Sequence, residues 1–354
     1  FRELTLRTRD ALAALYASPA SDEDKRAGKA ALLQRMRDEY ALLRDGPWQG
    51  YAGYDAWMAR ANNASLAVLA AYTELVPRFE RLYEQEGRDM ARRMYANFRP
   101  TVVCGFGGYP ALPALLAALK DDVPTVIHEQ NAVLGRVNRY LAGKVNAIAT
   151  AYPNVERLKY KFDHKVHLVG NPVREEVLAL RGEEFPALTD ESVFRLLVTG
   201  GSQGASILSD VVPEGLSMLP ISLRRRLQVT QQCRAEDIER VRATYAELEI
   251  PADLATYITD MPEKLSWAHL VIARAGASTL AELTVAGRPA ILVPLPSAMD
   301  DHQTANVREL VEAGGARSIP QQHFTPVELA KQMQKMALEP GALQNAAKRP
   351  WNCG

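Results

Sequence analysis

The residues best suited to chemistry stand in short turns, each of which follows a run of apolar and β-branched residues. The turn Gly200-Gly201-Ser202-Gln203-Gly204 would let backbone N–H groups approach an anion where a helix begins, and Ser202 would add a hydroxyl donor. This turn is either a cradle for a diphosphate or a tight strand-to-helix connection, and the local pattern leaves both open. It is neither a G-x-G-x-x-G fingerprint nor a Walker loop, because the Gly-Lys-Ser/Thr ending is missing.

A second turn of this kind runs from Gly276 to Glu282. Ser278 and Thr279 could bind phosphate at the helix start, where backbone N–H groups favour an anion. Glu282 follows Thr279 by three residues on nearly the same helix face, so its carboxylate could accept both hydroxyls of a ribose. The alternative, which the pattern alone favours, is a capping box in which Ser or Thr caps the helix and Glu reaches back.

Two further turns are crowded with polar side chains. Asp300, Asp301 and His302 could be metal ligands, but residues adjacent in sequence rarely converge on one ion, so an N-capping cluster with Gln303 facing a ligand is favoured. His128-Glu129-Gln130-Asn131 combines acid, base and amide groups at a strand end, which favours function over a polar turn around one buried histidine. Ala132 excludes the H-E-x-x-H zinc motif at this turn.

The elements that must position these turns alternate between strand and helix patterns. Strands are expected near 101–104, 124–127, 146–150, 166–169, 194–199, 270–273 and 289–293. This alternation predicts an α/β fold with parallel sheets, whose ligands bind beyond the carboxyl ends of the strands. The turns described above follow such ends, so the sequence itself marks where a site should form.

The first hundred residues have a different composition. They hold 12 of the 25 aromatic residues and none of the six histidines. Helices are expected over about 4–16, 29–43 and 63–86, with a turn and a cap between Ser18 and Asp24. The uneven composition predicts two pieces of different architecture.

Composition excludes several function classes. The 354 residues include 42 basic and 42 acidic side chains, and a formal net charge of zero argues against a nucleic-acid partner. Three cysteines are too few for a disulfide framework. No apolar run reaches the length of a membrane-spanning helix, and no signal peptide is visible, so a cytoplasmic chain is expected. Because the chain begins with Phe1 rather than Met, we expect a fragment, a processed chain or an assembled one.

Taken together, the turns resemble one family. Residues 98–340 are similar to MurG, the glycosyltransferase family of peptidoglycan synthesis. The motifs that carry the resemblance, in order and with fitting spacing, are Gly105-Phe106-Gly107-Gly108-Tyr109, His128-Glu129-Gln130-Asn131, Gly170-Asn171-Pro172-Val173-Arg174, Gly200-Gly201-Ser202-Gln203-Gly204-Ala205, Tyr257-Ile258-Thr259-Asp260-Met261, Arg274-Ala275-Gly276-Ala277 and Asp301-His302-Gln303-Thr304-Ala305-Asn306.

The resemblance implies a GT-B architecture of two Rossmann-like domains. It also implies an inverting hexosyltransferase, without cofactor or metal, that moves GlcNAc from UDP-GlcNAc to lipid I to form lipid II. Asn131 would contact the donor sugar, Arg174 and Ser202 the diphosphate, Ile258 the uracil through its backbone, and Gln303 the GlcNAc. Ala277, Ser278, Thr279, Leu280, Ala281 and Glu282 would hold phosphate and ribose, with Glu282 on the ribose hydroxyls. Gly105, Gly107, Gly108 and Tyr109 would belong to the acceptor loop.

One part of the family pattern is absent. Family members begin with a strand leading to a Gly-Thr-Gly-Gly-His loop that carries the expected base, and nothing in residues 1–97 matches it. The N-terminal Rossmann-like domain is therefore expected to be truncated and transfer to be impaired, with His128 as the remaining candidate for the catalytic base. The alternatives are a nucleotide-sugar binding module without catalysis and a helical peptidase remnant that acts as a scaffold.

Residues 1–88 resemble the C-terminal segment of a family of bacterial zinc aminopeptidases. The motifs are Gly50-Tyr51-Ala52-Gly53-Tyr54-Asp55-Ala56-Trp57 and Asn62-Asn63-Ala64, continued by Val76-Pro77 and Phe79. The metal-binding motif of that family is not in this chain, so its activity is not implied. A fusion is expected, with a helical segment at 1–95, a partial acceptor domain at 96–170, a UDP-GlcNAc-binding domain at 171–340 and an unassigned tail at 341–354.

The resemblance also implies a peripheral enzyme on the inner face of the bacterial plasma membrane. Leu112, Leu115, Leu116 and Leu119 form an apolar stripe at helical spacing, and Arg136, Arg139 and Lys144 could meet an anionic membrane surface. For the stripe alone, a core helix packed on the sheet is the favoured alternative.

Overall fold

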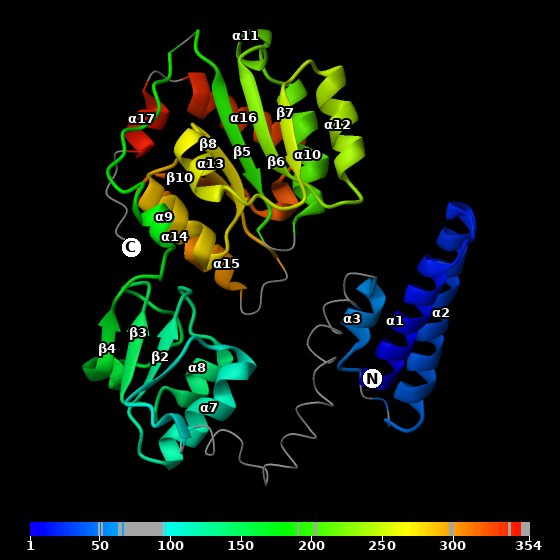
Figure 1. Cartoon of the computed structure of the whole chain (residues 1–354), viewed down its shortest axis with the longest axis vertical. Coiled ribbons are helices and arrows are strands. Elements are labelled where there is room, and N and C mark those ends of the chain that lie inside the picture. The colour runs from blue at the N-terminus through cyan, green and yellow to red at the C-terminus, as the bar shows by residue number, and fades with distance from the viewer. Residues whose placement is uncertain are drawn as a thin grey trace. The chain divides into compact units, whose positions relative to one another are not determined.

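The structure is a computed structural model that describes residues 1–48, 50, 52–62, 66, 95, 97–189, 191–201, 204–296, 301–338 and 341–347 (Figure 1). It divides into two compact units, Phe1–Asn97 and Phe98–Gly354. The change in composition near residue 100 therefore coincides with a structural boundary.

The first unit is helical within its described residues. Its helices are α1 (Arg2–Ala17), α2 (Asp22–Asp45) and α3 (Asp55–Arg60). Ser21 caps α2 by accepting the backbone N–H of Asp24, as expected for the turn between the first two helices. A small apolar core, which includes Leu4, Met36 and Met58, joins the three helices. Most of the helix expected over 63–86, and most of the aminopeptidase motif after Asn62, lies outside the described residues.

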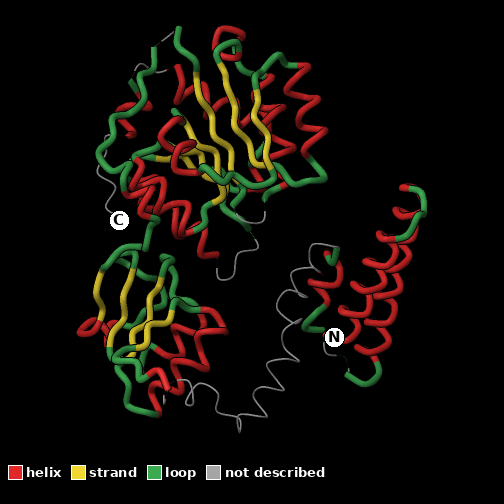
Figure 2. The backbone as a smooth tube through the Cα atoms, viewed as in Figure 1, coloured by secondary structure: helices red, strands yellow, loops and turns green. Residues whose placement is uncertain are grey.

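A small parallel sheet begins the second unit. Its strands run in the order β1 (Val103–Gly105), β2 (Thr125–Glu129), β3 (Ala147–Thr150) and β4 (Val166–Leu168). Two helices pack against it, α7 (Gly108–Lys120) and α8 (Arg136–Leu141) (Figure 2). The four strands expected in this region are confirmed, each displaced by no more than two residues at either end.

The apolar stripe predicted to meet a membrane lies on helix α7, where most of it is covered by the small sheet. Leu115 is 1% exposed in the core of the small sheet, and Leu112 and Leu119 pack against the same core. Leu116 alone among the four leucines is classed as exposed. The periodicity found the apolar face correctly, but that face covers the sheet, as the core-helix alternative proposed.

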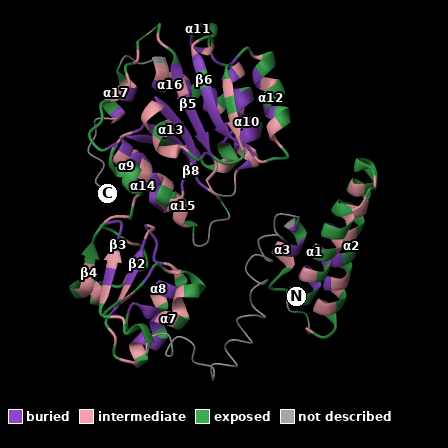
Figure 3. Cartoon of the chain, in the orientation of Figure 1, coloured by how far each residue is buried: buried purple, intermediate pink, exposed green. Residues whose placement is uncertain are grey.

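The larger sheet is also parallel, with the strand order β10-β9-β8-β5-β6-β7. Its strands are β5 (Phe194–Thr199), β6 (Leu227–Gln232), β7 (Ala252–Ala255), β8 (Leu270–Arg274), β9 (Ala290–Val293) and β10 (Ala316–Ser318). The strands β5, β8 and β9 are rich in buried apolar residues because helices cover both faces, and Figure 3 shows β5 and β8 as buried. The sequence patterns identified these three strands and did not single out β6, β7 and β10.

The helices of the larger sheet form its two outer layers. They are α9 (Glu175–Leu178), α10 (Ser206–Ser217), α11 (Ile221–Arg224), α12 (Ile238–Glu247), α13 (Met261–Trp267), α14 (Ala277–Ala286), α15 (His302–Glu312), α16 (Pro326–Leu338) and α17 (Ala342–Ala347). Helices α10, α12 and α16 share one core with the strands, and α13, α14 and α15 share the other.

The strand order creates a switch point between β5 and β8. From β5 the chain proceeds outward through β6 and β7, whereas from β8 it proceeds the other way through β9 and β10. The connections that follow β5 and β8 therefore diverge at the carboxyl edge, which leaves a crevice there. The turns after Thr199 and Arg274 flank this crevice.

Candidate functional site

A cavity of about 360 Å³ lies at this switch point. Five residues predicted to bind the donor line it, namely Arg174, Ile258, Ser278, Thr279 and Glu282. They come from the segment before α9, the loop after β7 and the first turns of α14. The structure thus brings together side chains that lie more than a hundred residues apart in the sequence.

The turn after β5 forms part of the wall, through Gly201. A Cβ atom at Gly200 would lie 2.5 Å from the backbone nitrogen of Ala205, so the tight turn admits only glycine there. Gly201 has a φ of 75° and Gly204 a φ of 65°, both in the left-handed region. Ser202 and Gln203, predicted to meet the diphosphate and to complete the motif, lie outside the described residues.

Gln232, at the end of β6, is a wall residue that the sequence patterns missed. Its Oε1 accepts hydrogen bonds from Thr199 Oγ1 at 3.0 Å and from the Gly200 N–H at 3.2 Å. Its Nε2 donates to the carbonyl oxygens of Gly201 at 2.9 Å and Thr256 at 3.3 Å. The available signal was the pair of glutamines that ends this strand, because a buried side-chain amide needs hydrogen-bond partners.

The start of α14 shows that the capping-box interpretation is wrong. Gly276 is the N-cap residue, and no side chain caps the helix. Glu282 instead accepts a hydrogen bond from Arg174 Nε at 2.9 Å, with Arg174 Nη2 2.8 Å from the same carboxylate oxygen. The carboxylate therefore faces the cavity and is held by a cation that could reach a phosphate.

The side chains in the first turns of α14 differ in what they can offer a ligand. Ser278 is exposed and Thr279 is half-buried, so both hydroxyls are available on the cavity side. Leu280 and Ala281 are buried in the core, and Ala277 carries no polar side-chain group. Ala277 would contact a phosphate through its backbone N–H at the helix N-terminus. The Leu280 N–H already donates to the Gly276 carbonyl oxygen at 3.0 Å, and Ala281 follows it in the helix, so the phosphate contacts expected for these two residues stay predictions.

Gln303 lies in the first turn of α15 and is held by the end of β9. Its Oε1 accepts the backbone N–H of Leu295 at 2.9 Å, which fixes the orientation of the amide. Asp301 is the N-cap residue and accepts the hydroxyl of Thr304 at 2.7 Å rather than a backbone N–H. Asp300 lies outside the described residues. Within the described part of the chain, no three His, Cys, Asp or Glu side chains are placed to hold a metal.

The polar turn after β2 is buried. His128 is 4% exposed, its Nε2 lies 2.9 Å from the carbonyl oxygen of Gly170, and its ring packs on Phe106 with centroids 5.2 Å apart. Among the described residues, Nδ1 has no hydrogen-bond partner. This geometry matches the polar turn with one buried histidine that the sequence left open, and a catalytic role for His128 stays a prediction.

Asn131 connects the small sheet with α15. Its backbone and side-chain N–H groups donate to Glu129 Oε1, each at 3.1 Å, and its Oδ1 accepts from Asn306 Nδ2 at 3.0 Å. Asn306, which is fully buried, also accepts the Ala132 N–H at 2.8 Å. The donor-sugar role predicted for Asn131 stays a prediction, while the structure adds a hydrogen-bonded bridge between the turn after β2 and helix α15.

The predicted acceptor loop joins β1 to α7. A Cβ atom at Gly105 would lie 2.3 Å from Leu115 Cδ1, and Gly107 and Gly108 have φ values of 75° and 72°. Tyr109 is exposed in the first turn of α7. The glycines therefore have a conformational reason to be there, and the helix N-terminus that they precede is suited to an anion.

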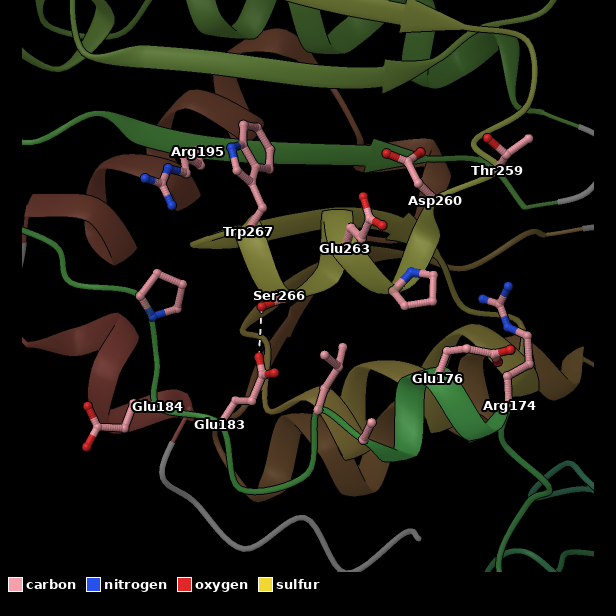
Figure 4. Close-up of a pocket in the computed structure, with 14 residues that line it drawn as sticks. Arg174, Glu176, Glu183, Glu184, Arg195, Thr259, Asp260, Glu263, Ser266 and Trp267 are labelled. Carbon is pink, nitrogen blue, oxygen red and sulfur yellow. Dashed lines mark hydrogen bonds between the residues drawn. The ribbon is translucent and has the colours of Figure 1, made fainter.

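A larger cavity of about 1040 Å³ lies between α9 and α13 (Figure 4). It shares Arg174 with the first cavity, but its wall is rich in carboxylates, including those of Glu176, Glu183 and Glu263. Ser266 Oγ donates to Glu183 Oε2 at 2.8 Å across it. The acidic lining would repel a diphosphate, so the smaller cavity at the switch point is the better candidate for the donor.

Comparisons with known proteins agree with this geometry. Residues 195–351 match the family model described as Glycosyltransferase family 28 C-terminal domain, and residues 69–150 match Glycosyltransferase family 28 N-terminal domain. Residues 1–100 match a model described as "Putative aminopeptidase", which confirms the second resemblance.

Two similar proteins are each named UDP-N-acetylglucosamine–N-acetylmuramyl-(pentapeptide) pyrophosphoryl-undecaprenol N-acetylglucosamine transferase. The one from Zymomonas mobilis is 67% identical over 268 residues, which are 76% of this chain and 69% of the relative. The one from Novosphingobium aromaticivorans is 68% identical over 269 residues, again 76% of this chain and 69% of the relative.

Solved structures support the same assignment. MurG from Acinetobacter baumannii aligns with a TM-score of 0.60 and 32% identity, covering 73% of this chain and 72% of that chain. The GT-B fold predicted from the motifs, with parallel sheets and a preceding helical segment, is confirmed. On the strength of these identities and coverages, this chain belongs to the MurG family of glycosyltransferases.

Proposed function

We propose that this chain binds UDP-GlcNAc and transfers GlcNAc to lipid I with inversion at the anomeric carbon, forming lipid II. The observation that carries the proposal is the cavity at the switch point, where Arg174, Ser278, Thr279 and Glu282 meet the loop of Ile258. This set combines a cation and hydroxyl donors for a diphosphate with a carboxylate for a ribose.

In the proposed donor complex the diphosphate lies at the N-terminus of α14, beside the glycine turn that precedes α10. Arg174 would leave the Glu282 carboxylate to bind the phosphate oxygens, or would bind both groups at once. Glu282 would accept the two ribose hydroxyls, and the backbone at Ile258 would pair with the uracil. Gln303 and Asn131 would face the GlcNAc, with Nε2 of Gln303 as a donor to a sugar hydroxyl.

The chemistry then depends on stabilising the departing UDP. Negative charge grows on the β-phosphate as the glycosidic bond breaks, and the N–H groups at the start of α14 and the Arg174 guanidinium stabilise that charge. We propose that these groups do this work without a metal. Preformed dipoles serve well here because they need not reorganise during the reaction.

The part of the proposed site that must activate the acceptor is less complete than the part that binds the donor. Gly105 to Tyr109 would receive the acceptor at the start of α7, and His128 is the predicted base. Its burial and its contact with Gly170 place the ring where direct proton abstraction needs rearrangement. Losing a general base typically slows a reaction by about 10²–10⁴-fold, so slow transfer is expected.

The remaining domain roles belong to the same proposal. Residues 96–170 would form the partial acceptor domain and 171–340 the donor domain, with an aminopeptidase-like segment at 1–95, and no role is assigned to residues 341–354. Among the described residues, no helix has the length and apolarity to span a bilayer. We propose a peripheral position on the inner face of the plasma membrane, where Arg136, Arg139 and Lys144 meet anionic lipid.

A radiolabelled transfer assay with UDP-GlcNAc and a lipid I analogue tests the proposal. Slow production of labelled lipid II, above a blank without protein, is expected. The second candidate function, a nucleotide-sugar binding module, is favoured by the buried His128 and predicts donor binding with no labelled product. Absence of both binding and transfer would contradict the proposal as a whole.

A further inference from the structure

Asn306, in the second turn of α15, is a polar residue at a fully buried position. Both ends of its side-chain amide are hydrogen-bonded to the turn after β2. Its Oδ1 accepts the Ala132 N–H at 2.8 Å, and its Nδ2 donates to Asn131 Oδ1 at 3.0 Å. One side chain of α15 therefore connects to two consecutive residues of that turn.

The other end of the Asn131 amide is held by Glu129. The Glu129 carboxylate is buried and accepts hydrogen bonds from four N–H groups. Oε1 accepts the backbone N–H and Nδ2 of Asn131, each at 3.1 Å, while Oε2 accepts the Gly135 N–H and Asn138 Nδ2, each at 2.8 Å. Because Gly135 and Asn138 hold the carboxylate in place, Glu129 is a fixed anchor for Asn131.

These contacts leave the Asn131 amide only one orientation. The backbone N–H of Ala132 can only donate, so Asn306 presents its oxygen to Ala132 and its nitrogen to Asn131. A flipped Asn131 amide would therefore place nitrogen against nitrogen at Asn306 and oxygen against oxygen at Glu129. In the observed orientation Nδ2 carries two hydrogens, and the bond to Glu129 uses one of them.

Asn306 also lies close to the other residue predicted to hold the sugar. Gln303 precedes Asn306 by three residues on α15, so the two side chains lie on nearly the same face of the helix. The hydrogen bond from Asn306 brings Asn131 to that face. The two residues proposed to contact GlcNAc therefore meet at one end of α15, although they come from distant parts of the chain.

We propose that Asn306 is a positioning residue that orients the Asn131 amide toward the donor sugar. The inference rests on the proposed function and deepens it, because it separates recognition of the GlcNAc from recognition of UDP. Asn306 itself need not touch the sugar. By holding Asn131 Oδ1, it directs the second hydrogen of Nδ2 to an oxygen of the ligand.

The test is calorimetric titration of the full chain with UDP-GlcNAc and, separately, with UDP. Asn306→Leu removes both hydrogen bonds at similar volume, and Asn306→Ala removes them with a smaller side chain. Asn131→Ala removes the proposed sugar contact, alone and combined with Asn306→Leu. Val307→Ala is the matched control, because Val307 is a buried neighbour on the same helix whose truncation lowers stability without removing an amide.

The quantity to compare is the ratio of UDP-GlcNAc affinity to UDP affinity. We expect it to fall by about threefold to tenfold in each Asn306 variant, the range for losing one neutral hydrogen bond, and to stay within about twofold of the parent value in the control. In the Asn131→Ala background, Asn306→Leu should lower the ratio by less than about twofold more, because the residue through which Asn306 acts is gone. Circular dichroism establishes that each variant is folded, and one folded Asn306 variant is decisive.

Several results would overturn the inference. An unchanged ratio in a folded Asn306 variant would show that Asn131 keeps its orientation alone, and an unchanged ratio in Asn131→Ala would show that Asn131 does not contact the sugar. An equal fall in Val307→Ala, or a further fall of about threefold when Asn306→Leu is added to Asn131→Ala, would show that Asn306 does not act through Asn131. Failure of both Asn306 variants to fold would assign Asn306 to stability alone. A parent chain that does not bind UDP-GlcNAc contradicts the proposed function itself, and this inference with it.

Discussion

Replacing Glu282 with alanine should weaken UDP binding, and the structure sets the size of the effect. Two contributions of opposite sign compete. The variant loses the carboxylate predicted to accept two ribose hydroxyls, and hydrogen bonds to a charged group are worth about 1.5–3 kcal/mol each. It also frees Arg174, whose Nε and Nη2 lie 2.9 and 2.8 Å from the Oε1 atom of Glu282.

The second contribution is the smaller one. The Arg174 side chain is 46% exposed and that of Glu282 is 19% exposed, and an ion pair with so open a partner contributes roughly 0–1 kcal/mol. Releasing Arg174 therefore offsets only part of the loss, and UDP affinity should fall by about tenfold or more. Uridine lacks the phosphates that a freed Arg174 could reach, so its affinity should fall further than that of UDP.

Titration calorimetry with UDP and uridine, on the parent and on Glu282→Ala, measures both effects. Arg240→Ala is a suitable control because Arg240 forms ion pairs with Asp210 and Asp237, and none of the three lines the cavity. The reasoning is refuted if Glu282→Ala binds UDP as tightly as the parent does, since the ribose role would then be wrong.

Further variants test the glycine turn, the bridge between the turn after β2 and helix α15, and the response to pH. Gly200→Ala would place its Cβ 2.5 Å from the backbone nitrogen of Ala205. Thermal unfolding should therefore show a stability lower by about 2 kcal/mol or more, and titration should show weaker UDP binding. Asn306→Ala leaves buried partners unpaired and should lower the free energy of unfolding in urea by about 1–3 kcal/mol, whereas Arg308→Ala, at an exposed ion pair, should change it by less than about 1 kcal/mol. Burial lowers the pKa of His269 to about 4, below its value of about 6.5 in an unfolded chain. Between these two pKa values the unfolded chain binds more protons than the folded chain. The contribution of neutral His269 to the free energy of unfolding is therefore complete above about pH 6.5 and is lost as the pH falls to about 4. In urea unfolding measured at a series of pH values, His269→Gln should flatten the curve between about pH 4 and 6.5.

The sequence predicted the parts of the fold that depend on local patterns. Strand patterns ending at Thr199 and Ala273 identified central strands, and the glycines after them identified the turns, because strand and turn preferences act over a few neighbouring residues. The edge at which the donor cavity lies followed from the parallel topology. Those inferences needed no knowledge of distant contacts.

Other features depend on residues far away in the chain. Ser278 or Thr279 could have capped α14 with Glu282 reaching back, and only Arg174, 108 residues earlier, shows where the carboxylate goes. Gln232 takes its partners from segments 33 and 24 residues away, so no local motif announces it. Helical periodicity found the apolar face of α7 but could not tell a sheet from a membrane, because both present an apolar surface to that face.

The most direct measurement of the central claim is calorimetric titration of the full chain with UDP-GlcNAc in buffer containing EDTA. The proposed donor site predicts saturable binding at one site per chain, competition by UDP, and weaker binding of GDP-GlcNAc because the uracil contact at Ile258 is lost. Absence of binding, or equal binding of the uridine and guanosine donors, would contradict the claim that the cavity at the switch point is a UDP-GlcNAc site.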